Sequence, residues 1–299
     1  MRNRVLSIDG ATNTGTCARR WGAGYPKLLL IHGFGDGAFV WNAVAPALAA
    51  SGGVLAIDLP GHGDSAHNAT AEYRLSEYVA DVHRILQSPD LRDMVLMGHS
   101  LGAEIAIEVT ARARNVRGLV IVDSGPGLNE AAVAFMRERF VQQRWDYDDP
   151  EAHIEELKAR LPLAAEQTLR GIAGDALKPV GHRFALKCDR NLAASKLSCS
   201  DDEKWALLRE IRVPVLIVRG AGSAILPRSS AERMLVELPS SSLQTVPAAG
   251  HAVMLDNPSG FCAAVEPFIA KIFSAEQEYS PVQPPAAGFM RRSGDVLGG

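Results

Sequence analysis

Residues 98–102 read Gly98-His99-Ser100-Leu101-Gly102 (GHSLG), and this pentapeptide is the most informative stretch of the chain. It follows the apolar run Met94–Met97, which predicts a strand, and precedes Ala103–Ala113, which predicts a helix. A tight strand-to-helix turn needs small residues around a serine held in a strained backbone conformation. Such a turn raises the serine Oγ above the sheet, and the backbone N–H of Leu101 then points at a developing oxyanion. The stretch therefore predicts Ser100 as a nucleophile.

Strands and helices alternate on both sides of this turn. Short β-branched and leucine-rich runs are separated by amphipathic stretches such as Ser76–Gln87, whose apolar residues follow the helical period. Apolar runs with both faces buried, each followed by a helix, indicate a parallel sheet covered by helices on both sides. The predicted strands are 4–8, 16–21, 27–31, 54–57, 94–97, 118–122, 213–218 and 243–246, and the helices among them are 76–87, 103–113, 204–211, 229–238 and 260–273.

The alternation stops between about Gly125 and Glu203, where no strand is predicted. Helices predicted over 135–144, 150–160 and 162–174 indicate an all-helical insertion that covers the C-terminal edge of the sheet; a long crossover without functional importance is the alternative. Beyond Ala275 the composition changes to Pro, Gly and Ser, which predicts a flexible tail. The predicted organisation is a core of residues 1–124 and 204–275, a helical cap of residues 125–203 and a tail of residues 276–299.

A base is needed beside Ser100, because a free hydroxyl is a poor nucleophile near neutral pH. Among the eight histidines, His251 has the most suitable context. It lies in a loop after the predicted strand Leu243–Val246, at the same sheet edge as Ser100. His99, inside the turn, and His62, in a turn-forming loop, are expected to be structural.

A second glycine-containing turn, His32-Gly33-Phe34-Gly35, follows the predicted strand Lys27–Ile31. Glycines let the backbone approach a substrate closely, so the N–H of Phe34 is a candidate second oxyanion donor beside that of Leu101. His32 is a candidate substrate-binding residue. The alternative is a plain strand-to-helix turn in which the His32 ring is stacked.

Four motifs, in this order and spacing, resemble those of the α/β-hydrolase superfamily: HGFGDG at 32–37, DLPGHGDS at 58–65, GHSLG at 98–102 and AAGH at 248–251. The resemblance extends from about residue 4 to residue 273, with the helical insertion in the place of the family's cap. It implies an α/β fold with a mostly parallel eight-stranded sheet, helices on both faces and a helical cap. It also implies a serine hydrolase that needs no metal or organic cofactor, with a triad in the order Ser, acid, His.

The acid departs from the commonest pattern of that superfamily. Most members carry it in the loop after the strand predicted here over 213–218, where this chain has Ala224. Asp123 ends the strand Gly118–Val122, and a minority of the superfamily, including a hydrolase of vitamin B6 breakdown, uses an acid at this place. We therefore expect Asp123 to orient His251 and to stabilise its imidazolium.

Two alternatives to that assignment stay open. Many relatives carry an aspartate at the position of Asp123 only as a hydrogen-bond partner of nearby loops. The vacant position at Ala224 is also compatible with an inactivated variant, a non-catalytic, sensor-like protein that binds a ligand in the pocket.

The expected substrate is a small carboxylic ester, lactone, thioester or amide. Hydrolases of carbon–carbon bonds in diketones or ring-cleavage products share the motifs and the cap, so that reaction is an alternative, and an acyltransferase is another. Selectivity is expected to lie in the cap, where basic side chains can pair with a substrate carboxylate unless they form a solvated helix face. Candidate lining residues there are Trp145, Tyr147, His182, Arg183, Phe184 and Lys187.

Composition excludes other classes of protein. Hydrophobic residues make up 47% and charged residues 22% of the chain, which is typical of a globular protein and not of a disordered, fibrous or disulfide-rich one. A net charge of −3 gives no reason to expect nucleic acid or a membrane as a partner. The four cysteines form no CxxC and no zinc-site spacing, which favours free thiols and a cytoplasmic location. Homo-oligomerisation is left open.

Overall fold

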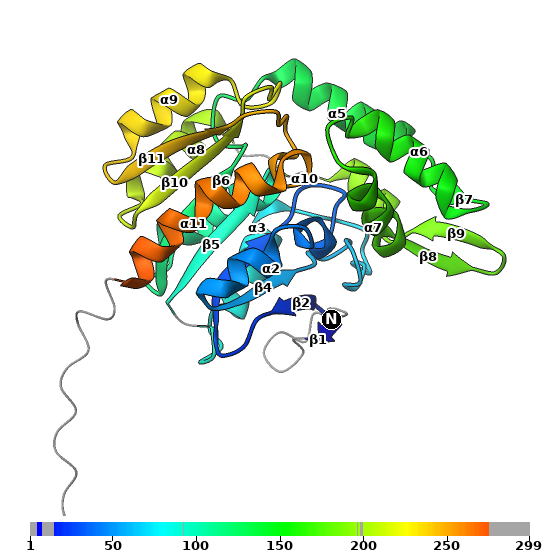
Figure 1. Ribbon diagram of the computed structural model, residues 1–299, viewed down its shortest axis with the longest axis horizontal. Coiled ribbons are helices and arrows are strands. Elements are labelled where there is room, and N and C mark those ends of the chain that lie inside the picture. Colours follow the sequence, from blue (N-terminus) through cyan, green and yellow to red (C-terminus); the bar gives the residue numbers. More distant parts are fainter. Residues whose placement is uncertain (1–4, 8–14, 92, 196, 198–199, 275–299) are drawn as a thin grey trace, which may run out of the picture.

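A computed structural model of the 299-residue chain describes residues 5–7, 15–91, 93–195, 197 and 200–274 (Figure 1). The predicted tail of residues 276–299 lies outside this range. The described part is an α/β fold built on an eight-stranded sheet in the order β1-β2-β4-β3-β5-β6-β10-β11. The strands are β1 (Val5–Ser7), β2 (Cys17–Trp21), β3 (Pro26–Ile31), β4 (Gly53–Ile57), β5 (Met94–His99), β6 (Val116–Val122), β10 (Val215–Gly220) and β11 (Ser241–Val246).

The sheet is mostly parallel, as predicted. Only the β1–β2 and β2–β4 pairs are antiparallel, and from β4 to β11 every neighbouring pair runs in the same direction. The register places Ile31 beside Gly98, His99 beside Val122, and Val122 beside Val218. Parallel strands in this register end at one edge, so the loops after β3, β5, β6, β10 and β11 gather there.

Helices cover both faces of the sheet, which explains why its strands are apolar on both sides. In β3, Leu28 and Leu30 pack into one hydrophobic cluster and Leu29 and Ile31 into another, and all four are at most 1% exposed. The first cluster includes residues of η1, α2 and α11, and the second includes residues of α3, α4, α8 and α9 on the opposite face (Figure 1). These helices are η1 (Ala38–Trp41), α2 (Ala45–Leu48), α3 (Leu75–Ile85), α4 (Leu101–Arg112), α8 (Asp201–Glu210), α9 (Arg228–Glu237) and α11 (Pro258–Ser274); η2 (Ala49–Ser51) and α10 (Val253–Asp256) are short.

The insertion between β6 and α8 is mainly helical, but the expectation that it contains no strand was wrong. Three short strands form an antiparallel sheet in the order β7-β9-β8, and Gly181 turns the chain between β8 and β9 with a φ of 62°. These strands have at most four residues each, and only Tyr147, Leu177 and Leu186 in them are buried, so they lack the buried apolar run by which a strand is recognised. The elements are α5 (Glu130–Gln142), β7 (Asp146–Tyr147), α6 (Pro150–Arg160), α7 (Glu166–Ala176), β8 (Leu177–Val180), β9 (Arg183–Leu186) and η3 (Arg190–Ala194).

The insertion packs against the core beside the loop that follows β3. A Cβ atom on Gly35 would lie 2.8 Å from the Phe140 ring of α5, so the two segments are in close contact. The carboxylate of Asp175 in α7 accepts hydrogen bonds from Arg19 (2.7 Å) and Asn42 (2.8 Å) of the core. Over the described residues, no helix is both long and apolar enough to cross a membrane.

Candidate active site

Ser100 occupies the sharp turn between β5 and α4 with a φ of 52° and a ψ of −118°. Neighbouring backbone holds this strained conformation: the Ser100 N–H donates to the carbonyl of Val122 at 3.2 Å. A Cβ atom on Gly98 would lie 2.1 Å from the carbonyl oxygen of Gly102, and one on Gly102 would lie 2.2 Å from that of Ile31. Because backbone fills both spaces, the turn requires glycine at both positions.

Asp123 and His251 meet at the same sheet edge. The Oδ2 atom of Asp123 lies 2.8 Å from Nδ1 of His251, although the two residues are 128 positions apart in the sequence. The Asp123 side chain is fully buried, and that of His251 is 18% exposed. A buried carboxylate in this contact fixes the tautomer in which Nδ1 carries the proton and leaves Nε2 free to accept one.

Two further donors satisfy the buried Asp123 carboxylate, and both come from the end of β10 and the loop after it. The backbone N–H of Gly220 donates to Oδ1 at 3.0 Å, and the hydroxyl of Ser223 donates to Oδ2 at 2.5 Å. Ala224, at the position where the resemblance implied the usual acid, is exposed. The residue of this loop that faces the Asp123–His251 pair is therefore Ser223.

A buried arginine holds that loop in place. Arg219 is 9% exposed, and its guanidinium donates to four carbonyl oxygens, those of Gly220, Ala221, Ser223 and Leu226, at 2.8–3.2 Å. These bonds fold residues 220–226 around one side chain, which presents the Ser223 hydroxyl to Asp123. Neither Arg219 nor Ser223 was among the site residues predicted from the sequence. β10 runs from Val215 to Gly220, two residues beyond the predicted end, and this is what places Arg219 in the strand.

Nε2 of His251 is buried without a hydrogen-bond partner among the described residues. Two side chains hold the backbone around His251 in place. Nε2 of His99 contacts the carbonyl oxygen of His251 at 2.9 Å, and Asp256 accepts the N–H of Gly250 at 2.8 Å. Burial lowers the pKa of His99 to about 3, so its ring stays neutral, in keeping with the structural role expected for it.

The turn after β3 lies directly against Ser100. A Cβ atom on Gly33 would be 3.2 Å from the Cβ of Ser100, so glycine permits this approach. The neighbouring Phe34 ring lies 4.5 Å from the Phe140 ring of α5 at an interplanar angle of 55°, which packs the turn against the insertion. Leu101 is the first residue of α4, where backbone N–H groups have no acceptor within the helix. The two amides predicted as oxyanion donors thus come from the segments that flank Ser100.

The structure places His32 differently from its prediction as a substrate-binding residue. The His32 ring is fully buried, accepts the N–H of Leu59 at Nε2 (3.0 Å) and contacts the carbonyl of Gly33 through Nδ1 (2.7 Å). It also lies 4.9 Å from the ring of His62, which is buried as expected for a structural residue. Burial lowers the pKa of His32 to about 4. With both nitrogens engaged, His32 shapes the turn and offers nothing to a substrate.

The other candidate lining residues divide into three groups. Trp145 borders a cavity of about 320 Å³ and lies 5.3 Å edge-on from Phe140, whose ring contacts Phe34. Phe184 and the fully buried Tyr147 pack within the insertion itself. Among the basic candidates, Arg183 is exposed and bonded to Asp148 (2.9 Å), Lys187 is paired with Asp64 (2.6 Å), and His182 is exposed, which agrees with the alternative of a solvated face.

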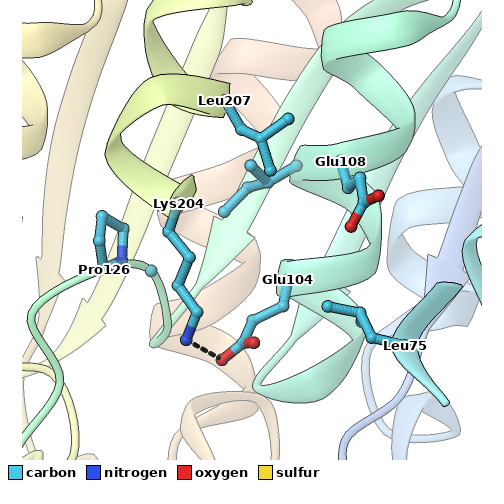
Figure 2. A pocket seen from close by; sticks show the side chains of 8 residues that line it. Leu75, Glu104, Glu108, Pro126, Lys204 and Leu207 are labelled. Carbon is cyan, nitrogen blue, oxygen red and sulfur yellow. Dashed lines mark hydrogen bonds and ion pairs between the residues drawn. The ribbon is translucent and has the colours of Figure 1, made fainter. Parts of the chain in front are cut away.

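A second hollow, between α4 and α8, lies outside this group of residues. In Figure 2 the side chains of Lys204 and Glu104 point toward each other, and their ion pair spans 3.2 Å. The hollow holds about 10 Å³, room for a single water at most. The ion pair between Lys204 and Glu104 beside it joins the two helices. Within the described part of the chain, no group of three or more His, Cys, Asp or Glu side chains is arranged to hold a metal ion, and Cys188 and Cys262 are buried thiols.

Comparison with known proteins identifies the family. The alpha/beta hydrolase family model matches residues 28–265, so the chain belongs to this family. A pimeloyl-[acyl-carrier protein] methyl ester esterase of Aromatoleum aromaticum is 28% identical over 261 residues, which are 81% of this chain and 97% of that protein. A 2-hydroxymuconate semialdehyde hydrolase of a Pseudomonas species is 25% identical over 266 residues, 85% of this chain and 90% of that one.

A solved structure supports the same fold. That of E-2-(acetamidomethylene)succinate hydrolase matches with a TM-score of 0.80 and 24% identity over 89% of this chain and 98% of that one. With esterases, a lipase and hydrolases among its relatives, the chain is a hydrolase, and the non-catalytic alternative is set aside.

Proposed function

We propose that this enzyme is a serine hydrolase with Ser100 as nucleophile, His251 as general base and Asp123 as the acid that orients the base. Nε2 of His251 takes the proton of Ser100 as Oγ attacks the substrate carbonyl carbon. The amides of Phe34 and Leu101 donate to the resulting oxyanion. His251 then protonates the leaving group, and water activated by the same ring releases the acyl group.

The contact of 2.8 Å between buried Asp123 and His251 carries this proposal. An aspartate that served only as a hydrogen-bond partner of loops would need nothing more than the amide of Gly220 and the hydroxyl of Ser223. The third contact of Asp123, to a histidine whose other nitrogen has no partner, is the arrangement that a triad acid requires. The strained backbone of Ser100 at the same sheet edge supports it further.

The proposed substrate is a small-molecule carboxylic ester, lactone, thioester or amide. Ester hydrolysis is favoured by a relative that is itself a methyl ester esterase. Carbon–carbon bond hydrolysis is the second candidate, because another relative at similar identity is a 2-hydroxymuconate semialdehyde hydrolase. Product analysis on an aryl ester and on a vinylogous diketone separates the two reactions.

Labelling with a fluorophosphonate probe tests the nucleophile and its activation. We expect the native chain to be labelled, Ser100→Ala to lose all labelling, and Asp123→Asn to be labelled far more slowly. Circular dichroism of the three proteins controls for folding. Labelling that persists in Ser100→Ala contradicts the assignment of the nucleophile, and unchanged labelling of Asp123→Asn contradicts that of the acid.

A further inference from the structure

Asp36 lies beside the proposed nucleophile, in the turn that carries the Phe34 amide. Its backbone N–H donates to the carbonyl of Gly33 at 3.3 Å, so the chain folds back and brings the Asp36 side chain over Gly33. The position that a Cβ atom on Gly33 would take is 3.2 Å from Oδ2 of Asp36 and 3.2 Å from Cβ of Ser100. The carboxylate and Ser100 Cβ are therefore separated by no more than twice that distance.

The Asp36 carboxylate differs from the other buried carboxylates around the sheet edge. Asp58 accepts two backbone N–H groups, Asp123 has three partners, and Asp256 accepts the N–H of Gly250. Asp36 is half-buried, and its carboxylate has no hydrogen bond or ion pair within the part of the chain that the structure describes. Burial raises its pKa, which the positive charges of Arg160 and of a protonated His251 counteract.

An uncompensated carboxylate at this place opposes the proposed reaction. Negative charge develops on the substrate oxygen beside the Phe34 amide, and a second negative charge on Asp36, in the same turn, repels it. A hydrogen-bond donor or a positive charge on the substrate removes this repulsion. The same group on the substrate also supplies the hydrogen-bond partner that the Asp36 carboxylate lacks.

We propose that Asp36 is a specificity-determining residue, which accepts a hydrogen bond from a donor group on the substrate close to the scissile carbonyl. Ammonium, amide N–H and hydroxyl groups share this chemistry. The inference rests on the proposed serine-hydrolase function, since it places the substrate carbonyl at Ser100. Arg160, at the end of α6, has no ion pair among the described residues and acts on Asp36 only through its charge.

Three phenyl esters of equal acyl length test the proposal: those of 3-aminopropanoic, 3-hydroxypropanoic and butanoic acids. Their β-substituents are an ammonium, a hydroxyl and a methyl group, so they separate charge from neutral hydrogen bonding. We expect the native enzyme to favour the best donor ester over the butanoate by about tenfold in kcat/KM. In Asp36→Asn this preference should fall to about twofold, with the butanoate hydrolysed several times faster than by the native enzyme.

Arg160→Gln is the matched control, because it removes the opposite charge. We expect it to increase the preference for the ammonium ester, since the competing cation is lost. The proposal is overturned if the ratios of the three esters are the same in Asp36→Asn and the native enzyme, or if all three decline in parallel, as loss of turn structure would cause. Failure of the serine-hydrolase function is a separate result, seen as ester turnover that survives Ser100→Ala.

Discussion

The hydroxyl of Ser223 donates a hydrogen bond of 2.5 Å to Oδ2 of Asp123, the same oxygen that contacts the ring of His251. Ser223 also accepts the backbone N–H groups of Ile225 and Leu226, at 3.1 and 3.2 Å, so its hydroxyl joins the loop to the carboxylate. The loop that follows β10 thus contributes a donor to an aspartate supplied by β6.

Asp123→Asn should lower kcat/KM by about 10⁴-fold, because an amide next to Nδ1 favours the wrong imidazole tautomer and does not stabilise the imidazolium. Steady-state kinetics on an ester that the native enzyme turns over measures the effect. Unfolding in urea provides the control for folding. A decrease of less than tenfold would mean that Asp123 has only a structural role.

Ala224→Asp should not restore activity to Asp123→Asn. Ala224 is exposed, and Ser223 occupies the place that faces His251, so a carboxylate at position 224 has no path to Nδ1 without rebuilding the loop around Arg219. The kinetics of the double variant check this expectation. Strong recovery in the double variant, or strong activation by Ala224→Asp alone, would show that the vacant position can serve as the acid site.

Ser223→Ala should weaken both stability and catalysis. A hydrogen bond to a buried charged group contributes about 1.5–3 kcal/mol, and we expect the free energy of unfolding to fall by that amount. Looser alignment of His251 should lower kcat/KM by about tenfold. Ser230→Ala is the control, since the Ser230 hydroxyl donates only to the carbonyl of Gly127 at 2.6 Å. Equal kinetics of the two variants would contradict a positioning role of Ser223.

Gly102→Ala should destabilise the protein by about 3 kcal/mol, because the added methyl group would meet the backbone of β3. Its Cβ would lie 2.2 Å from the carbonyl oxygen of Ile31 and 2.6 Å from that of His32. Gly174→Ala is the control, for nothing lies within 4 Å of a Cβ there. Position 174 is helical, so we expect a gain of about 0.5–1 kcal/mol. Chemical denaturation of both variants provides the comparison.

Acid should destabilise the protein through its buried histidines. Burial lowers the pKa of His32 to about 4 in the folded state, below the 6.5 of an exposed histidine. The stability that neutral His32 contributes is thus complete above about pH 6.5 and is lost as the pH falls toward 4. Between pH 6.5 and 5 the loss from this residue is about 2 kcal/mol. In His32→Gln, whose amide oxygen can accept the Leu59 N–H, urea denaturation should show a decrease smaller by that amount.

Local pattern was sufficient for most of the fold. Strands buried on both faces are continuous apolar runs, and the turn around Ser100 is read from five adjacent residues, so the sheet, its helices and the position of the serine follow from neighbours in the chain. Where the pattern is weak, prediction was wrong. The hairpin of β8 and β9 buries only Leu177 and Leu186, so its sequence has no buried apolar run to distinguish it from a loop.

The composition of the site depended instead on register and packing. Val122 is paired with Val218, so Asp123 lies near the end of β10. The buried Arg219 folds the loop that follows β10, and the Ser223 hydroxyl of that loop donates to Asp123. Local sequence has no information on such contacts between residues about 100 positions apart. Pairing also decides which charged side chains are engaged: the guanidinium of Arg183 is bonded to Asp148, whereas the carboxylate of Asp36 has no partner among the described residues. Secondary structure is determined by residues that are neighbours in the sequence. The partner of each charged side chain is determined by how distant segments pack in three dimensions.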